Sequence, residues 1–108
     1  MNNCTFTGYL LHDPQIETGE ANGGPSCCVF KMVVYEYRKS KGGQKQRIPT
    51  TLTFEAWASG AETIAKLAQK GTKMTLYCSA RNGVMKTDSV DDTIFRVNEF
   101  DFACLDKD

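Results

Sequence analysis

The sequence has no long hydrophobic run, and no segment approaches the roughly 20 apolar residues that a membrane-spanning helix needs. Its first residues also lack the basic start and apolar stretch of a secretory signal. We therefore expect a cytoplasmic protein. The 108 residues are enough for one domain of ordinary size with a modest core.

Metal-ligating groups are scarce and poorly spaced. Histidine occurs only at position 12, and the five cysteines include no Cys-x-x-Cys pair. Because no neighbour in sequence completes a ligand set, we interpret His12 as a turn residue; a cysteine–histidine pair formed in space is the alternative. The odd cysteine number favours reduced thiols, and small core roles are expected for Cys28, Cys78 and Cys104.

Motifs for catalysis are also missing. The chain has no phosphate-cradling glycine loop and no nucleophile motif. Asp91 and Asp92 are adjacent, so their side chains diverge and are poorly placed for joint acid–base work. We predict no catalytic residue, no metal site and no cofactor.

The net charge is zero, with 13 basic and 13 acidic residues, but these charges are unevenly distributed along the chain. Residues 1–81 carry ten Lys or Arg against six Asp or Glu, whereas residues 82–108 carry three against seven. A polyanion needs positive charge on only one face of its partner. The zero total argues against very tight binding, so we expect binding to be steeply salt-dependent.

The most basic stretch is 38–47, which holds five Lys or Arg and no acidic residue. It contains two glycines and lies between two predicted strands, with Tyr35, Tyr37 and Trp57 nearby. A basic hairpin flanked by exposed rings suits single-stranded nucleic acid, which offers both phosphates and flat bases. A solvated loop without a partner is the alternative.

Alternation of apolar and polar residues predicts five strands, at 4–10, 28–37, 51–57, 73–81 and 93–102. Turns and loops are predicted at 12–14, 19–25 and 82–92. In the last strand, Phe100 and Phe102 are out of phase with Phe95 and Val97. A bulge, or a face packed against another subunit, would explain the change of phase.

A helix is predicted at 60–70. Ser59 and Glu62 have capping-box spacing, and Ile64, Leu67 and Ala68 share one face. Gly71 would end the helix. Five strands with one helix between the third and fourth form the element order of an OB-fold, which binds oligonucleotides on its second and third strands. We therefore predict an all-β protein with one short helix, folded as a five-stranded Greek-key barrel. One such domain would span 1–108, with a short C-terminal extension at 103–108.

Alternation also predicts which side chains face outward. Trp57 shares its side of the strand with polar residues, which argues against core packing, and it would stack on bases together with Tyr37. For Tyr77, a surface ring or a subunit contact is an equal alternative. The predicted nucleic-acid contacts are Lys31, Tyr35, Tyr37, Arg38, Lys39, Lys41, Lys45, Arg47, Thr51, Thr53, Trp57, Lys73, Tyr77, Arg81 and Lys86.

Two stretches of the chain resemble the bacterial-type single-stranded DNA-binding protein family, which includes phage members. The first runs from Gly8 to Pro14 and resembles a first strand ending in glycine, a hydrophobic residue and a basic residue before Asp-Pro. The second runs from Glu55 through Glu62 to Lys70 and Gly71, and is similar to the family's third strand, helix and Lys-Gly turn.

The resemblance covers about residues 2 to 102 and implies a role for particular residues. The family's stacking aromatics match Tyr37 and Trp57, whereas a third aromatic position falls on Thr51. The sequence shows neither the family's long acidic tail nor the aromatic residue that is common in the loop after the fourth strand, where Val84 and Met85 lie nearby. The resemblance implies homodimers or homotetramers, with replication proteins as possible further partners.

These observations predict a non-catalytic protein that coats single-stranded DNA with little sequence preference in replication, recombination and repair. Its setting would be a bacterial cell or a phage-infected host. The alternative is an OB-fold accessory subunit of a replisome or primosome that uses its aromatic residues to bind protein. RNA binding by the same surface is a further alternative.

Overall fold

The computed structural model describes residues 1–17, 26–82 and 93–102. The long strands are β1 (Cys4–Leu10), β3 (Cys27–Lys39), β4 (Lys45–Trp57), β5 (Lys73–Asn82) and β6 (Thr93–Phe102). A two-residue strand, β2 (Ile16–Glu17), pairs with β3, and helix α1 (Ala58–Leu67) joins β4 to β5. Four predicted features lie outside the described residues: Lys86, Cys104, the loop at 19–25 and the extension at 103–108. Of the loop predicted at 82–92, Asn82 is instead the last residue of β5, and the rest lies outside the described residues.

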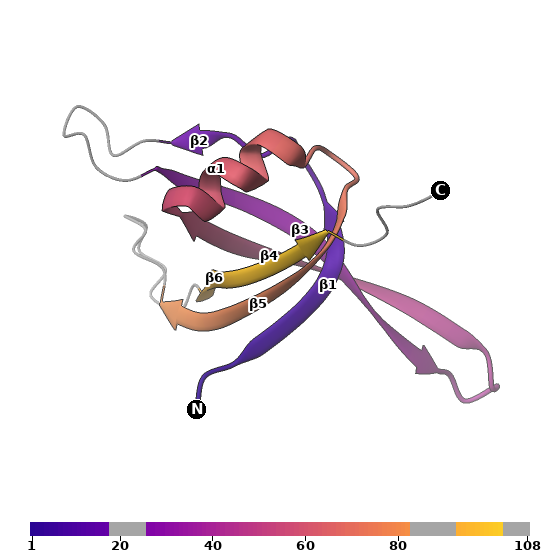
Figure 1. The fold of residues 1–108 in the computed structure, drawn as a ribbon. Coiled ribbons are helices and arrows are strands. Elements are labelled where there is room, and N and C mark those ends of the chain that lie inside the picture. The colour runs from indigo at the N-terminus through magenta and orange to yellow at the C-terminus, as the bar shows by residue number, and fades with distance from the viewer. Residues whose placement is uncertain (18–25, 83–92, 103–108) are drawn as a thin grey trace, which may run out of the picture.

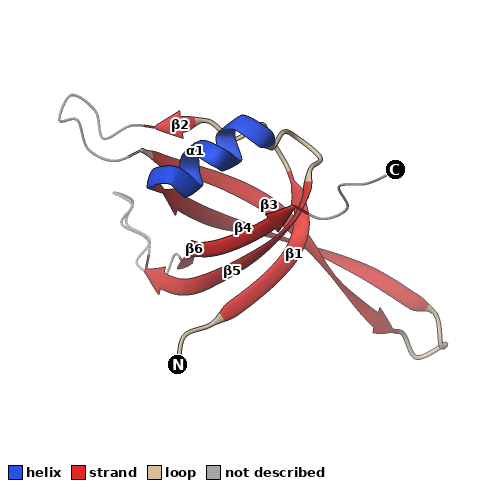
Figure 2. Ribbon diagram, in the orientation of Figure 1, coloured by secondary structure: helices blue, strands red, loops and turns tan. Residues whose placement is uncertain are grey.

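The five long strands close into a barrel (Figures 1 and 2). Around the barrel the order is β1-β5-β6-β4-β3, and β3 returns to pair with β1. All of these pairs are antiparallel except β4 with β6, where Phe54 lies opposite Phe95. The predicted OB-fold with one short helix is confirmed.

The barrel interior is filled by the inward residues of each strand. Cys28 and Cys78 are buried there, as predicted, and burial raises their thiol pKa values to about 11 and about 12. Thiols with such values are almost entirely protonated near neutral pH and therefore behave as packing groups. The largest fully buried side chains are Phe54, Met32, Ile64, Met74 and Leu76.

The change of phase in β6 is a β-bulge. Tyr77 lies opposite Glu99, but its neighbour Cys78 lies opposite Val97, so Asn98 is the extra residue. The bulge lets Phe95 and Val97 on one side of it, and Phe100 and Phe102 on the other, all pack against the core. The first of the two predicted explanations is therefore confirmed.

Helix α1 begins earlier than predicted and has no capping box. Its N-cap is Trp57, which makes no side-chain cap hydrogen bond. The Glu62 carboxylate instead accepts a hydrogen bond from the Ser26 hydroxyl, at 3.0 Å. The first helical residue, Ala58, has a φ of 55°, in the left-handed region that disfavours residues other than glycine. This sharp turn out of β4 lets the Ala58 amide bond to the Ser26 carbonyl.

The helix also ends earlier than predicted, at Leu67, because Ala68 is extended. Of the predicted apolar face, Ile64 and Ala68 are buried, but Leu67 is 61% exposed; Ala61 takes its place in the core. Gly71 lies in the following turn with a φ of 90°, and so does not end the helix itself. No helix among the described residues is long and apolar enough to cross a membrane.

The β3–β4 hairpin extends well beyond the barrel (Figure 1). Each strand has 13 residues, and the pairing runs without interruption from Cys27 opposite Trp57 to Lys39 opposite Lys45. Both strands are longer than predicted. The residues that the prediction left out at the hairpin end, 38–39 and 45–50, are mostly polar, so no apolar alternation signals a strand there. The turn is closed by hydrogen bonds between Ser40 and Gln44, and between Gly43 and Ser40.

Barrel closure depends on a close approach at Gly8. Here β1 passes from β5 to β3, with Gly8 opposite both Met74 and Val34. A Cβ atom on Gly8 would lie 2.3 Å from the Val33 carbonyl oxygen, a backbone atom, and 2.9 Å from a Val34 methyl. Only glycine fits unless the two strands separate.

We predict that Gly8→Ala destabilises the fold by about 3 kcal/mol, near the top of the usual overpacking range. A matched control is Gly42→Ala in the hairpin, where the nearest atom would be 4.0 Å away. The control should change the unfolding free energy by less than about 0.5 kcal/mol. Urea titration measures both; equal stability of the Gly8 variant and wild type would contradict this account of closure.

We predict that Ala58→Gly stabilises the protein by about 0.5–1 kcal/mol, because glycine adopts the left-handed region without strain. The control is Ala65→Gly in the same helix, which should lose about 1 kcal/mol. The two substitutions remove the same methyl group, so the opposite signs in urea unfolding isolate the backbone effect. A loss of stability in both variants would show that Ala58 is not strained.

Candidate nucleic-acid interface

The candidate interface is the outward face of β3 and β4. Residues directly opposite each other in this antiparallel pair share a face, and residues two apart along a strand return to it. Tyr37 lies opposite Arg47, and Trp57 lies opposite Cys27. One face therefore carries Tyr35 and Tyr37 of β3 together with Trp57 of β4, as the alternation predicted.

The aromatic rings on this face are accessible. Trp57 is 37% exposed and Tyr37 is 67% exposed, so neither belongs to the barrel core. The two rings are far apart, because ten residues separate Cys27, the partner of Trp57, from Tyr37. At about 3.3 Å per residue this is about 33 Å along the ribbon. Any one polymer that contacts both must be several units long.

Between the rings the face carries one cation, Lys31, and one carboxylate, Glu55, which lies opposite Val29 near Trp57. Lys31 lies opposite Thr53, and Val33 lies opposite Thr51. Lys31 and Thr51 are exposed and Thr53 is half-buried. The small side chains of Thr51 and Thr53 leave the surface between the two rings open, with no third aromatic ring there.

The hairpin end of the face is positive. Lys39 and Lys45 lie opposite each other and share the face of Tyr37 and Arg47. Lys41 is exposed in the turn. Arg38 is the exception among the predicted hairpin cations. It lies opposite Gln46 on the reverse face, and its guanidinium forms an ion pair with Glu36 at 3.4 Å.

The Trp57 end is mixed in charge. The Arg96 guanidinium carbon lies 5.9 Å from the centre of the Trp57 ring system, a cation–π distance. Arg81 forms an ion pair with Glu55 at 3.1 Å, so its charge is already partly compensated. Burial raises the pKa of the nearby Cys27 thiol, and the charges of Glu55 and Glu17 raise it further.

Two residues near this face were not predicted. Arg96 is brought to Trp57 by the parallel pairing of β6 with β4, in which it lies opposite Glu55. Tyr9 is brought to Tyr35 by the pairing of β1 with β3, and their ring centres are 6.3 Å apart. Both placements follow from pairing between strands that are neighbours in the barrel but distant in the sequence, so no local sequence pattern signals them.

Tyr77 has different surroundings from the other candidate rings. Its hydroxyl donates a hydrogen bond to Asp101 at 3.2 Å, and Glu99 lies directly opposite on β6. The hydrogen bond and the charges of these acids raise the pKa of Tyr77. The sign of the local charge disfavours phosphate at this ring.

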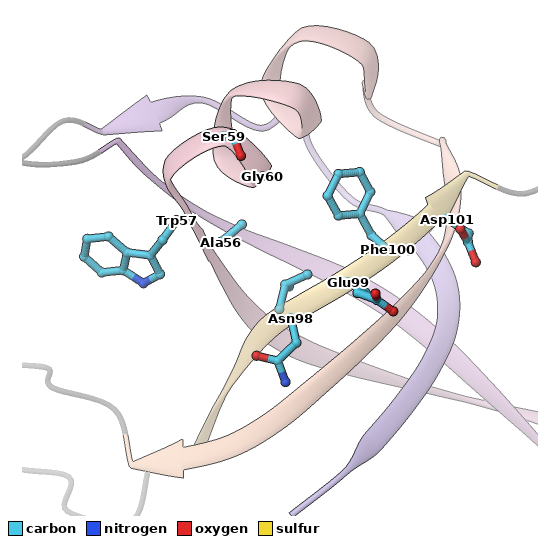
Figure 3. A pocket seen from close by; sticks show the side chains of 9 residues that line it. Ala56, Trp57, Ser59, Gly60, Asn98, Glu99, Phe100 and Asp101 are labelled. Carbon is cyan, nitrogen blue, oxygen red and sulfur yellow. The ribbon is translucent and has the colours of Figure 1, made fainter.

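A hollow of about 480 Å³ lies beside Trp57, between the start of α1 and β6. Figure 3 shows Phe100 directed toward the helix, while the Trp57 indole extends away from it. Glu99 and Asp101 line the opposite side, and they give the hollow a negative rim. The hollow is therefore poorly suited to the backbone of a polyanion.

Within the described ranges, no group of three or more His, Cys, Asp or Glu side chains could hold a metal ion. His12 is exposed in the bend after β1. Cys4 and Cys78 lie opposite each other on β1 and β5, and both are free thiols.

Comparison with solved structures gives extensive matches. A deletion mutant of the single-stranded DNA binding protein from Thermus aquaticus matches with a TM-score of 0.79 and 16% identity, over 94% of this chain and 50% of that one. The small single-stranded DNA-binding protein from Streptomyces coelicolor matches at 0.75 and 14%, over 94% of both chains. An SSB from Plasmodium falciparum in complex with single-stranded DNA matches at 0.74 and 18%, over 98% of this chain and 96% of that one.

These matches define the chain as an OB-fold barrel. More particularly, it has the fold seen in bacterial single-stranded DNA-binding proteins, so the resemblance expected from the sequence motifs is confirmed at the level of structure. The chain spans about half the length of the Thermus aquaticus protein. No family model matches it, and no curated protein matches its sequence.

Proposed function

We propose that this protein binds single-stranded DNA with little sequence preference and without catalysing a reaction. The observation that carries the proposal is the outward face of β3 and β4, where exposed Trp57 and Tyr37 share one surface with cations that make no ion pair with a described carboxylate. Bases stack on such rings regardless of sequence, because every base has a π-face.

The stacking would act at both ends of the ribbon. OB folds engage roughly 4–16 nucleotides, so one strand can reach across the separation between Trp57 and Tyr37. Each stacked base contributes about 1–3 kcal/mol. Thr51 and Thr53, between the rings, would contact the sugar–phosphate chain or a base edge by hydrogen bonding.

The phosphates would be neutralised mainly in the hairpin half of the face. Lys39, Lys45 and Arg47 make no ion pair with a described carboxylate. Arg81 and Arg38 already hold Glu55 and Glu36, so recruiting them would first break an ion pair. Lys31, Lys41 and Lys73 complete the set of proposed phosphate contacts among the described residues, and Lys86, which lies outside them, stays a proposed contact from the sequence alone.

The proposal extends to the biological setting. A protein of this kind would act on strands exposed during replication, recombination and repair, in the cytoplasm of a bacterial cell or a phage-infected host. We also propose that residues 1–108 act as one OB unit and that copies associate as homodimers or homotetramers, with replication proteins as further partners. Several modest sites on one strand would raise avidity, which suits a subunit of zero net charge.

We predict that Trp57→Ala weakens oligo-dT binding by about 1–3 kcal/mol at every salt concentration, because stacking does not release counterions. The double substitution Lys39→Ala, Lys41→Ala should instead reduce the slope of log affinity against log salt by about 1.4, since each single-strand phosphate contact contributes about 0.7. At high salt, Trp57→Ala should therefore lose more affinity than the lysine double variant. Anisotropy of a labelled oligo-dT measures all variants.

Two controls make the result specific. Trp57→Phe retains an aromatic plane and should keep most of the affinity. Lys66→Ala with Lys70→Ala removes the same charge from exposed positions in and just after α1, and should leave the slope near that of wild type. Identical slopes for wild type and the hairpin variant would exclude the hairpin from the interface. A complete lack of binding by wild type would favour the protein-binding alternative.

A further inference from the structure

Two tyrosines on the outward face of β1 and β5 have nearly equal exposure and opposite surroundings. Tyr9 is 38% exposed, and the Lys73 ammonium lies 5.8 Å from its ring centre. Tyr77 is 37% exposed and donates a hydrogen bond to Asp101. Only four residues, or about 13 Å of strand, separate Lys73 from Tyr77 on β5. The two ends of this small surface therefore favour opposite charges in a ligand.

Tyr9 continues the aromatic surface of β3. It lies opposite Val33 on β3 and opposite Lys73 on β5, so β1 connects the two strands at this level. The ring of Tyr9 meets that of Tyr35 at 63° with their centres 6.3 Å apart. The Arg47 guanidinium lies 4.3 Å over the Tyr35 ring. Two rings and two cations thus form a continuous row across four neighbouring strands, in the order Lys73, Tyr9, Tyr35 and Arg47.

The two cations in this row are available to phosphate. Among the described residues, neither Arg47 nor Lys73 has a carboxylate within ion-pair distance. Each lies over a tyrosine instead, and an exposed cation–π contact holds a cation only weakly. A phosphate can therefore take over the cation through charge-assisted hydrogen bonds, and the movement uncovers the ring for a base.

We propose that Tyr9, Tyr35, Arg47 and Lys73 form a second base-and-phosphate subsite, through which the bound strand leaves the β3–β4 face, crosses β1 and avoids Tyr77. Six residues along β3 separate this level from the partner of Trp57, so the subsite lies about 20 Å from the tryptophan. The proposal rests on the proposed single-strand binding and adds the direction in which the strand runs.

The test compares Tyr9→Leu with Tyr77→Leu, which remove the same ring at matched exposure. Binding is measured with oligo-dT of about 4 and about 16 nucleotides, the ends of the usual range of site sizes. For the longer oligomer, Tyr9→Leu should lose at least about fivefold in affinity, the lower limit for one stacked base. Tyr77→Leu should change affinity less than about twofold. Quenching of Trp57 by the short oligomer should be unchanged in both variants.

A second variant, Lys73→Gln, tests the same subsite without removing the Tyr9 ring, in case Tyr9→Leu disturbs the fold. Its salt slope for the longer oligomer should fall by about 0.7, the value for one phosphate on a single strand. Strong wild-type binding with equal affinities for both tyrosine variants, or a greater loss for Tyr77→Leu, would overturn the subsite while leaving the proposed function intact. A wild-type protein that binds no oligo-dT and shows no quenching of Trp57 would overturn both.

Discussion

The close contact between β1 and β3 at Gly8 determines the geometry of the whole binding surface. Because the strands approach within a distance that only glycine allows, β1 pairs with β5 through most of its length and with β3 at its end. That crossing closes the barrel and brings Tyr9 beside Tyr35. It also marks where the β3–β4 hairpin leaves the barrel and continues as a free two-stranded ribbon (Figure 1).

Charge is distributed over this surface in a way that the zero total conceals. Among the described residues, the hairpin and the row from Tyr9 to Arg47 carry cations that make no ion pair, whereas Glu55 lies near Trp57 and Glu99 and Asp101 line the hollow beside it. Stacking needs no net charge, but phosphate contacts do. On our proposal, Trp57 would therefore contribute mainly through its ring, and the outer ribbon mainly through its cations.

Much of the fold was predictable because its signals are local. Alternation located all five long strands, and the displaced phase of Phe100 and Phe102 indicated the bulge at Asn98. The capping box predicted at Ser59 was wrong because Ala58 turns sharply out of β4. Its amide bonds to the Ser26 carbonyl, which lies just before β3 and is far from Ala58 in the sequence. Tyr9 and Arg96 were missed for the same reason, because the residues that they contact are far from them in the sequence. The outward placement of Trp57 and Tyr37 followed from alternation alone.

The central claim is that unpaired bases lie against the exposed rings of the β3–β4 face. The most direct measurement is the NMR shift of the Trp57 indole and of the tyrosine ring protons when oligo-dT is added. Stacked bases produce ring-current shifts, so we predict large changes at Trp57 and Tyr37 and almost none at Tyr77. Changes concentrated at Tyr77 and around Glu99, with Trp57 and Tyr37 unaffected, would contradict the account.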